Sequence, residues 1–131
     1  MPFTILVVED NSNIRRFIRT ALELEGYGVR EASTLQEGVA LARRRQPDLI
    51  LLDLSMPDGS GWEFLRAMQA QPETRGLRIV ILTASADHGM AERGLASGAM
   101  AFLTKPIAAG ELVAQVRKTL DAQGAASERS D

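Results

Sequence analysis

The chain has 131 residues, of which 45% are hydrophobic and 24% charged, and its formal net charge is −2 at pH 7. These values are typical of one globular domain with its own core, and they give no electrostatic reason to bind nucleic acid or an acidic membrane. Without cysteine, disulfides and thiolate metal sites are excluded. The sequence shows no signal peptide and no apolar run of the roughly 20 residues that span a membrane, so we expect a cytoplasmic protein.

Short apolar segments bounded by turn residues predict five strands. The clearest is Leu49–Leu52, which lies between Pro47 and Pro57 and is typical of a strand buried on both faces of a parallel sheet. Gly28–Ala32 is more polar and is expected near a sheet edge. In chain order, the expected strands are Phe3–Val8, Gly28–Ala32, Leu49–Leu52, Arg78–Thr83 and Met100–Thr104.

Helices are predicted between these strands and after the last one. Apolar residues recur at helical spacing from Ser12 to Glu25, and Ser33, Thr34 and Ser60 each begin a capping-box pattern before a further helix. The expected helices cover residues 12–25, 35–45, 60–71, 87–97 and 109–122. Because residues 123–131 include no large apolar side chain, we expect a domain of residues 1–122 followed by a disordered tail.

Strands that alternate with helices predict an α/β fold, in which a doubly wound parallel sheet of five strands is covered by helices on both faces. The carboxyl ends of parallel strands lie at one edge, where open α/β sheets place their ligand crevice. Polar residues follow four of the strands there, namely Glu9 and Asp10, Asp53, Thr83, and Lys105. We therefore expect these side chains to converge.

The chemistry of these side chains points to phosphoryl transfer. Three carboxylates crowd together only around a cation, and oxygen ligands without His or Cys favour Mg²⁺. Lys105 and the Thr83 hydroxyl remain as donors for an anion. Asp53 is then placed to become an aspartyl phosphate, with the metal and Lys105 offsetting the charge on the phosphoryl oxygens.

The chain resembles the receiver domain of bacterial two-component response regulators, in its single-domain form, over roughly Thr4 to Ala122. The resemblance rests on the motifs ILVVEDN, LILLDLSMPDGSGWEFL, IVILTAS and AFLTKPI. It implies a flavodoxin-like fold with strand order 2-1-3-4-5 and a role in phosphorelay signal transduction. Asp53 would accept the phosphoryl group from a phosphohistidine of a sensor histidine kinase or phosphotransfer protein. Glu9, Asp10, Asp53 and the Ser55 backbone carbonyl would bind Mg²⁺.

The same resemblance implies how such a switch operates. Thr83 would hydrogen-bond the phosphoryl group, Phe102 matches the family's switch aromatic, and the Lys105–Pro106 bond would be cis. Movement of Thr83 would let the Phe102 ring turn inward and repack the surface of the fourth helix, fifth strand and fifth helix. That surface would meet an output partner or a second copy of the chain. The domain would catalyse only its own Mg²⁺-dependent phosphorylation and dephosphorylation.

Three other functions are compared with this pattern. An aspartyl phosphatase typically has a second Asp two residues after the first, where this chain has Ser55. Flavin binding is disfavoured because no Ser- and Thr-rich loop follows the first strand. A phosphorylation-independent interaction module of the same fold remains the alternative, although the complete set of acids, Thr83 and Lys105 argues against it.

Overall fold

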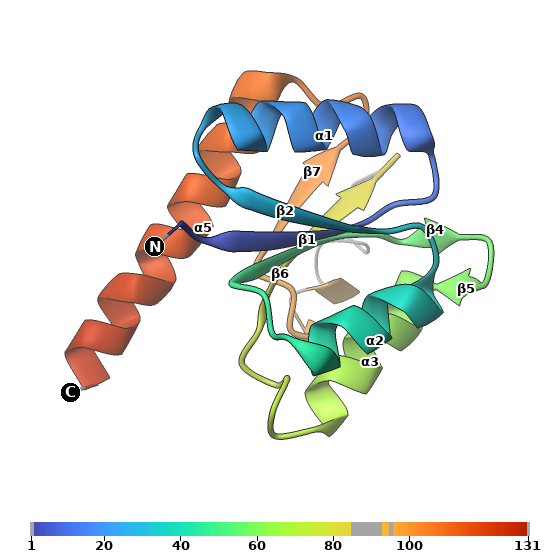
Figure 1. The fold of residues 1–131 in the computed structure, drawn as a ribbon. Helices are drawn as coiled ribbons and strands as arrows, with labels where there is room; N and C mark the ends of the chain where they lie inside the picture. The colour runs from blue at the N-terminus through green and yellow to red at the C-terminus, as the bar shows by residue number, and fades with distance from the viewer. Residues whose placement is uncertain (1, 85–92, 95, 131) are drawn as a thin grey trace.

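The computed structural model describes residues 2–84, 93–94 and 96–130, which form a parallel sheet between two layers of helices (Figure 1). The five strands of the sheet run in the order β2-β1-β3-β6-β7, and every neighbouring pair is parallel. Their bounds are β1 Thr4–Val8, β2 Gly28–Ala32, β3 Leu49–Asp53, β6 Arg78–Thr83 and β7 Ala101–Thr104. The flavodoxin-like order 2-1-3-4-5 is thereby confirmed, with the polar strand β2 at an edge.

A small hairpin that is absent from the predicted elements separates the central strand from the next helix. Its strands, β4 (Ser55–Met56) and β5 (Gly59–Ser60), pair antiparallel outside the main sheet. Two-residue strands carry no hydrophobic alternation, so their sequence signature is only that of the Pro57-Asp58-Gly59 turn. The hairpin extends the loop that follows Asp53.

Helices cover both faces of the sheet, with α1 and α5 on one side and α2 and α3 on the other (Figure 1). Their bounds are α1 Ser12–Leu24, α2 Leu35–Arg44, α3 Gly61–Ala70 and α5 Ala109–Ser130. Most of the helix predicted for residues 87–97 lies outside the described residues, although Arg93, Gly94 and Ala96 are helical. None of the helices in the described part is long and apolar enough to span a bilayer.

The sheet separates two apolar clusters, because successive residues of a strand point to opposite faces. In β3, Ile50 and Leu52 pack with α2 and α3, whereas Leu49 and Leu51 pack with α1 and α5. All four side chains are fully buried. This double burial explains why the central strand is a continuous apolar run. It also places the last residue of the strand, Asp53, at the end of four buried neighbours.

The helix starts follow the predicted capping chemistry. Asn11 caps α1 by accepting a hydrogen bond from the Ile14 amide at 3.0 Å, and Ser60 forms a reciprocal capping box with Glu63 at the start of α3. Thr34 caps α2. At the other end of the chain, α5 runs from Ala109 to Ser130, and the expectation that residues 123–131 form a disordered tail stays a prediction.

Candidate phosphoryl and metal site

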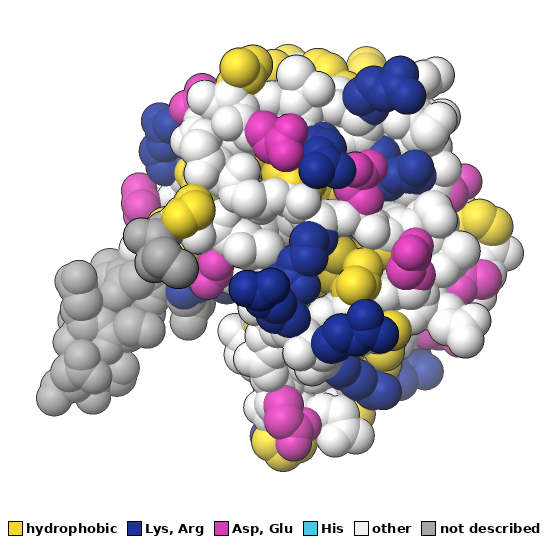
Figure 2. Space-filling view, viewed as in Figure 1, with side chains coloured by type: hydrophobic (Ala, Val, Ile, Leu, Met, Phe, Trp, Pro, Cys, Tyr) yellow, Lys and Arg dark blue, Asp and Glu magenta, His cyan; other side chains and the backbone are white. Residues whose placement is uncertain are grey.

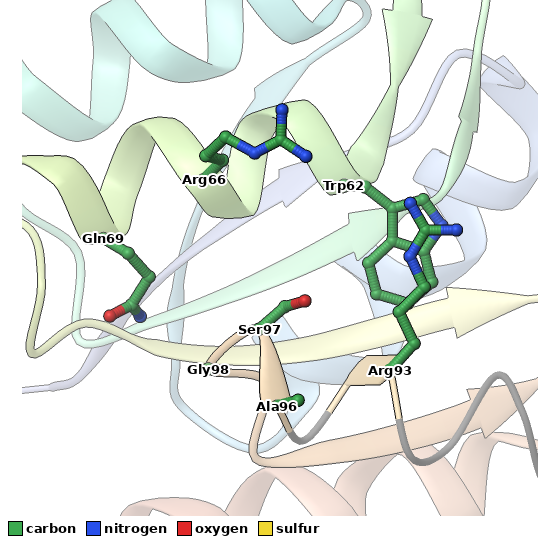
Figure 3. Close-up of a pocket in the computed structure, with 7 residues that line it drawn as sticks. All are labelled: Trp62, Arg66, Gln69, Arg93, Ala96, Ser97 and Gly98. Carbon is green, nitrogen blue, oxygen red and sulfur yellow. The ribbon is translucent and has the colours of Figure 1, made fainter.

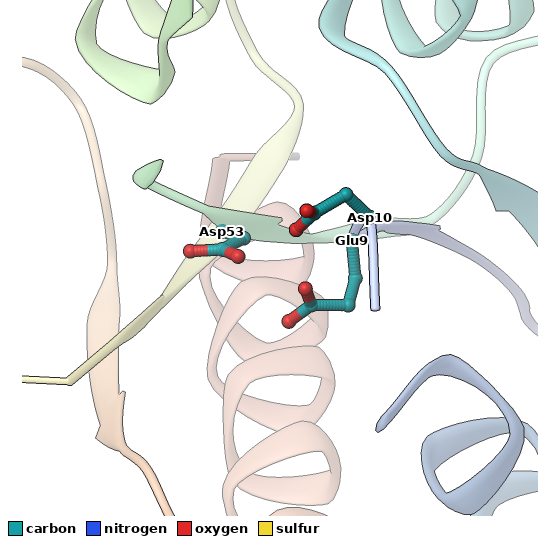
Figure 4. A group of neighbouring side chains, drawn as sticks. All are labelled: Glu9, Asp10 and Asp53. Atoms are coloured by element: carbon teal, nitrogen blue, oxygen red, sulfur yellow. The ribbon is translucent and has the colours of Figure 1, made fainter. Parts of the chain in front are cut away.

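Three carboxylates meet at the carboxyl edge of the sheet (Figure 4). Asp53 is the last residue of β3 and is 4% exposed, Glu9 follows β1 and is fully buried, and Asp10 is exposed. One carboxylate oxygen of each residue lies within 4.8 Å of the others. The predicted convergence of these acids is therefore present in the fold.

Lys105 supplies a positive charge between the two buried acids. Its Nζ lies 2.7 Å from Glu9 Oε1 and 3.0 Å from Asp53 Oδ2. Burial raises the pKa of Glu9 to about 7, against the hydrogen bonds from Lys105 and the Asn11 amide. Burial also disfavours the ammonium, but the hydrogen bonds to Glu9 and Asp53 outweigh it and raise the pKa of Lys105. The lysine therefore stays charged while it offsets part of the crowded negative charge.

Arg15 fixes the loop that carries Glu9 and Asp10 through hydrogen bonds to its backbone. This role of Arg15 was not predicted from the sequence. Arg15 Nη1 donates to the backbone carbonyls of Glu9 at 2.9 Å and Asp10 at 3.2 Å, while its Nε pairs with Glu31 at 3.0 Å. The Asn11 amide also donates to Glu9 Oε2 at 3.1 Å. No local sequence pattern indicates this role, because Arg15 reads only as one polar residue of an amphipathic helix.

The backbone around Asp53 depends on the hairpin and on the first turn of α3. The Ser55 amide donates to Asp53 Oδ1 at 3.0 Å, which holds the carboxylate in place. A Cβ on Gly61 would lie 2.8 Å from Leu54 Cα and 3.0 Å from the Asp53 carbonyl oxygen. Only glycine allows α3 to begin this close to the acceptor residue. The Ser55 carbonyl as a metal ligand stays a prediction.

The other expected site residues lie on the next two strands. Thr83 ends β6 and is 6% exposed, and its carbonyl accepts a hydrogen bond from the Lys105 amide at 2.7 Å. Phe102, in β7, is half-buried against the α2–α3 side of the core. A Cβ on Gly94 would lie 2.1 Å from Phe102 Cζ, so the ring rests directly on that glycine. The Lys105–Pro106 peptide bond is cis, as the resemblance implies.

The residues present fit a divalent cation. The donor set of Glu9, Asp10 and Asp53 consists only of carboxylate oxygens, which suit Mg²⁺ better than softer metals. Two of these carboxylates are buried, and a single ammonium faces both of them. A metal ion would offset the remaining negative charge of the cluster.

Fold and site together define an α/β domain in which three carboxylates that could hold a cation lie beside a lysine at the carboxyl edge of the sheet. The family model described as "Response regulator receiver domain" matches residues 5–117. The chain therefore belongs to the response regulator receiver domain family, the signalling modules of two-component systems.

Curated relatives and solved structures agree with this membership. The chain is 44% identical to the KDP operon transcriptional regulatory protein KdpE of Escherichia coli, over 88% of this chain and 50% of that protein. It is 40% identical to the phosphate regulon transcriptional regulatory protein PhoB of Pseudomonas aeruginosa, over 92% of this chain and 53% of that protein. The chain thus spans about half the length of these relatives.

Among solved structures, the chemotaxis protein CheY4 of Vibrio cholerae superimposes with a TM-score of 0.86 at 28% identity, covering 91% of this chain and 99% of that chain. The signal receiver domain of a Luxo repressor protein from Vibrio parahaemolyticus gives a TM-score of 0.90 at 27% identity, over 100% and 99% of the two chains. The whole described fold is that of a receiver domain.

Proposed function

We propose that this domain is a phosphorylation-dependent switch in which Asp53 accepts a phosphoryl group from the phosphohistidine of a sensor histidine kinase or phosphotransfer protein. The observation that carries the proposal is the position of Lys105, whose ammonium contacts both Glu9 and Asp53 beside Asp10. An acid on the surface needs no ammonium beside it. A buried carboxylate that gains a phosphoryl group does need one, because the ammonium offsets the added negative charge.

In the transfer step, an Asp53 carboxylate oxygen attacks phosphorus as the nitrogen–phosphorus bond of the donor breaks and the donor imidazole keeps the electron pair. Lys105 then moves from the carboxylate to a phosphoryl oxygen, a shift of one hydrogen bond. The Thr83 hydroxyl donates to another oxygen of the same group. Bound Mg²⁺, held by Glu9, Asp10, Asp53 and the Ser55 carbonyl, would supply further stabilisation of negative charge.

The phosphoryl group would change the protein through neighbouring strands. A group of about −1.5 to −2 charge draws the Thr83 side chain toward Asp53, and Thr83 pairs with Thr104 on β7. Phe102 lies two residues earlier on β7 and contacts Gly94. A shift of Thr83 would therefore alter the packing of Phe102, and with it the surface formed by β7, α5 and the preceding segment. Such a change is a shift between two populations.

The donor needs a docking surface within reach of Asp53, and an apolar pocket of about 450 Å³ beside Lys105 suits that purpose. Phe17 on α1 is 40% exposed there, although large aromatic side chains usually lie inside. The pocket is lined by Asn13, Ile14, Phe17, Lys105, Pro106 and Ile107. A helical donor domain that covers this patch would bring its phosphohistidine to the carboxyl edge of the sheet.

The first test measures phosphorylation itself. The purified domain is incubated with acetyl phosphate and Mg²⁺, and its intact mass is compared with that of Asp53→Asn. One phosphoryl adduct that requires Mg²⁺ and is absent from the variant supports the proposal. If neither acetyl phosphate nor a set of histidine kinases gives an adduct, the domain acts as a phosphorylation-independent interaction module.

A second test separates donor docking from chemistry. Phe17→Ser removes an exposed ring from the patch, and Leu24→Ser is a matched control because Leu24 is 80% exposed near the other end of the same helix. Phe17→Ser should slow transfer from a phosphorylated kinase while labelling by acetyl phosphate stays unchanged. Equal slowing by both variants, or slowed labelling by acetyl phosphate, contradicts docking at this patch.

Two further properties belong to the same proposal. The domain would catalyse only its own phosphorylation and the later hydrolysis of the aspartyl phosphate, as a cytoplasmic signalling module. Its output partner, or a second copy of the chain, would bind the surface of the fourth helix, β7 and α5. Most of that predicted fourth helix lies outside the described residues.

A further inference from the structure

A polar pocket lies between α3 and the segment that precedes β7, apart from both the carboxylate site and the apolar pocket beside Lys105 (Figure 3). Its volume is about 420 Å³, which is large enough for a small organic molecule and much larger than one ion needs. The lining residues are Trp62, Arg66, Gln69, Arg93, Ala96, Ser97 and Gly98. None of the residues assigned to phosphoryl transfer lines this pocket.

Two guanidinium groups give the pocket a positive charge, although the whole chain has a net charge of −2 and the face seen in Figure 2 carries basic and acidic side chains side by side. Arg66 comes from α3 and Arg93 from the opposite wall, and no acidic residue of the described ranges 2–84, 93–94 and 96–130 lines the pocket. Within the described residues, neither arginine forms an ion pair, whereas Arg15, Arg19 and Arg117 all do. Two arginines at one pocket, with no carboxylate partner in the part of the chain that the structure describes, favour an anionic ligand.

The pocket is also held in shape before any ligand arrives. The Arg93 guanidinium lies over the Trp62 ring at 4.4 Å from its centroid, a stacking contact that orients its donors. Gln69 Nε2 donates to the Arg75 carbonyl, and a Cβ on Gly98 would lie 2.3 Å from the same nitrogen. Gly98 has a φ of +101°, so both the backbone conformation and the close contact favour glycine.

We propose that this pocket binds a small molecule that carries a diphosphate group, with Arg66 and Arg93 each contacting one phosphoryl unit. A diphosphate presents several acceptor oxygens and multiple negative charges, which two guanidinium groups on facing walls match. The remaining volume, next to Gln69 and Ser97, accepts a polar organic part that can hydrogen-bond an amide and a hydroxyl. The ligand would bridge α3 and the wall that carries Arg93, Ser97 and Gly98.

Trp62 makes the proposal directly testable, because it is the single tryptophan of the chain and lines the pocket. Its fluorescence is followed while pyrophosphate, ADP or citrate is added to the full chain in EDTA, and calorimetry is run on the same samples. Without Mg²⁺ the three carboxylates of the other site repel anions. Arg66→Gln and Arg93→Gln are compared with Arg44→Gln, which changes an exposed arginine outside the pocket.

We expect pyrophosphate or ADP to bind saturably with a Kd below about 1 mM, and each pocket variant to weaken binding at least about tenfold, or about 1.4 kcal/mol. Arg44→Gln and Asp53→Asn should bind as the parent does. Tighter binding of ADP than of pyrophosphate supports a ligand whose diphosphate carries a polar organic part. No saturable binding of either diphosphate, binding of citrate alone, or equal binding by the pocket variants overturns the proposal.

Discussion

Glu9 is a fully buried carboxylate next to the Lys105 ammonium, and its pKa is raised from 4.5 to about 7 chiefly by burial. A carboxyl group whose pKa is higher in the folded state takes up a proton on folding. Its contribution to stability is complete below about pH 4.5 and is lost as the pH rises through 7. Without metal, the folded domain should therefore lose stability over this range.

We predict that the free energy of unfolding in EDTA falls by roughly 2–3 kcal/mol from pH 4.5 to pH 8 because of this one group, since each pH unit of difference corresponds to about 1.4 kcal/mol. Urea unfolding of the parent and of Glu9→Gln measures it. The variant should lack this part of the pH dependence. Parallel curves for the two proteins would show that Glu9 does not titrate in this range.

Gly61 is needed at the start of α3 because of space, since a Cβ there would collide with Leu54 Cα. We predict that Gly61→Ala lowers the free energy of unfolding by about 1–3 kcal/mol. It should also slow labelling by acetyl phosphate, because the shift reaches the Asp53 carbonyl. Gly76→Ala is the matched control, as a Cβ on Gly76 meets nothing within 4 Å. Similar melting and labelling of both variants would contradict the packing argument.

At the scale of elements, the β4–β5 hairpin is joined to α2 by Asp58. Its two carboxylate oxygens accept hydrogen bonds from the Leu35 amide at 2.9 Å and the Gln36 amide at 3.0 Å. These amides belong to the first turn of α2, which has no intrahelical partners for them. The hydrogen bonds from Leu35 and Gln36 lower the pKa of Asp58 below 3.8.

We therefore predict a lower Tm at pH 7 for Asp58→Asn, with faster amide exchange in the first turn of α2. Because the pKa is lowered by folding, this stabilisation is present above pH 3.8 and is lost as the pH falls below it. The Tm values of the parent and Asp58→Asn should then converge. Asp121→Asn, at an exposed position of α5, should melt like the parent at every pH.

An element could be predicted from the sequence when the residues that determine it lie within its own segment. Continuous apolar residues predict buried strands such as β3 and β6. The capping box and Pro72 predict the start and the end of α3. The convergence of Asp53 with Lys105 followed from topology, since parallel strand ends share an edge. The interactions of Arg15 and Asp58 could not be predicted, because they join backbone groups whose positions only the folded chain defines.

For the molecule as a whole, the limit of the independent domain is a prediction that can be checked. Residues 123–131 include no large apolar side chain, whereas Val116 and Leu120 pack in the α1–α5 cluster. We expect a chain ending at Ala122 to keep the Tm of the parent and the same rate of labelling by acetyl phosphate. A clear fall in Tm would show that the end of α5 contributes to stability.

Among the described residues, the two clusters on either side of the sheet share no side chain, and α1 and α5 cover one of them while α2 and α3 cover the other. A volume change on one side therefore has little energetic effect on the other, so substitutions across the sheet should combine additively. The layer of α1 and α5 and the layer of α2 and α3 can thus diverge separately in sequence. The strands contribute side chains to both layers, and Asp53, Thr83 and Lys105 lie where three of those strands end, so the site rests on both clusters at once.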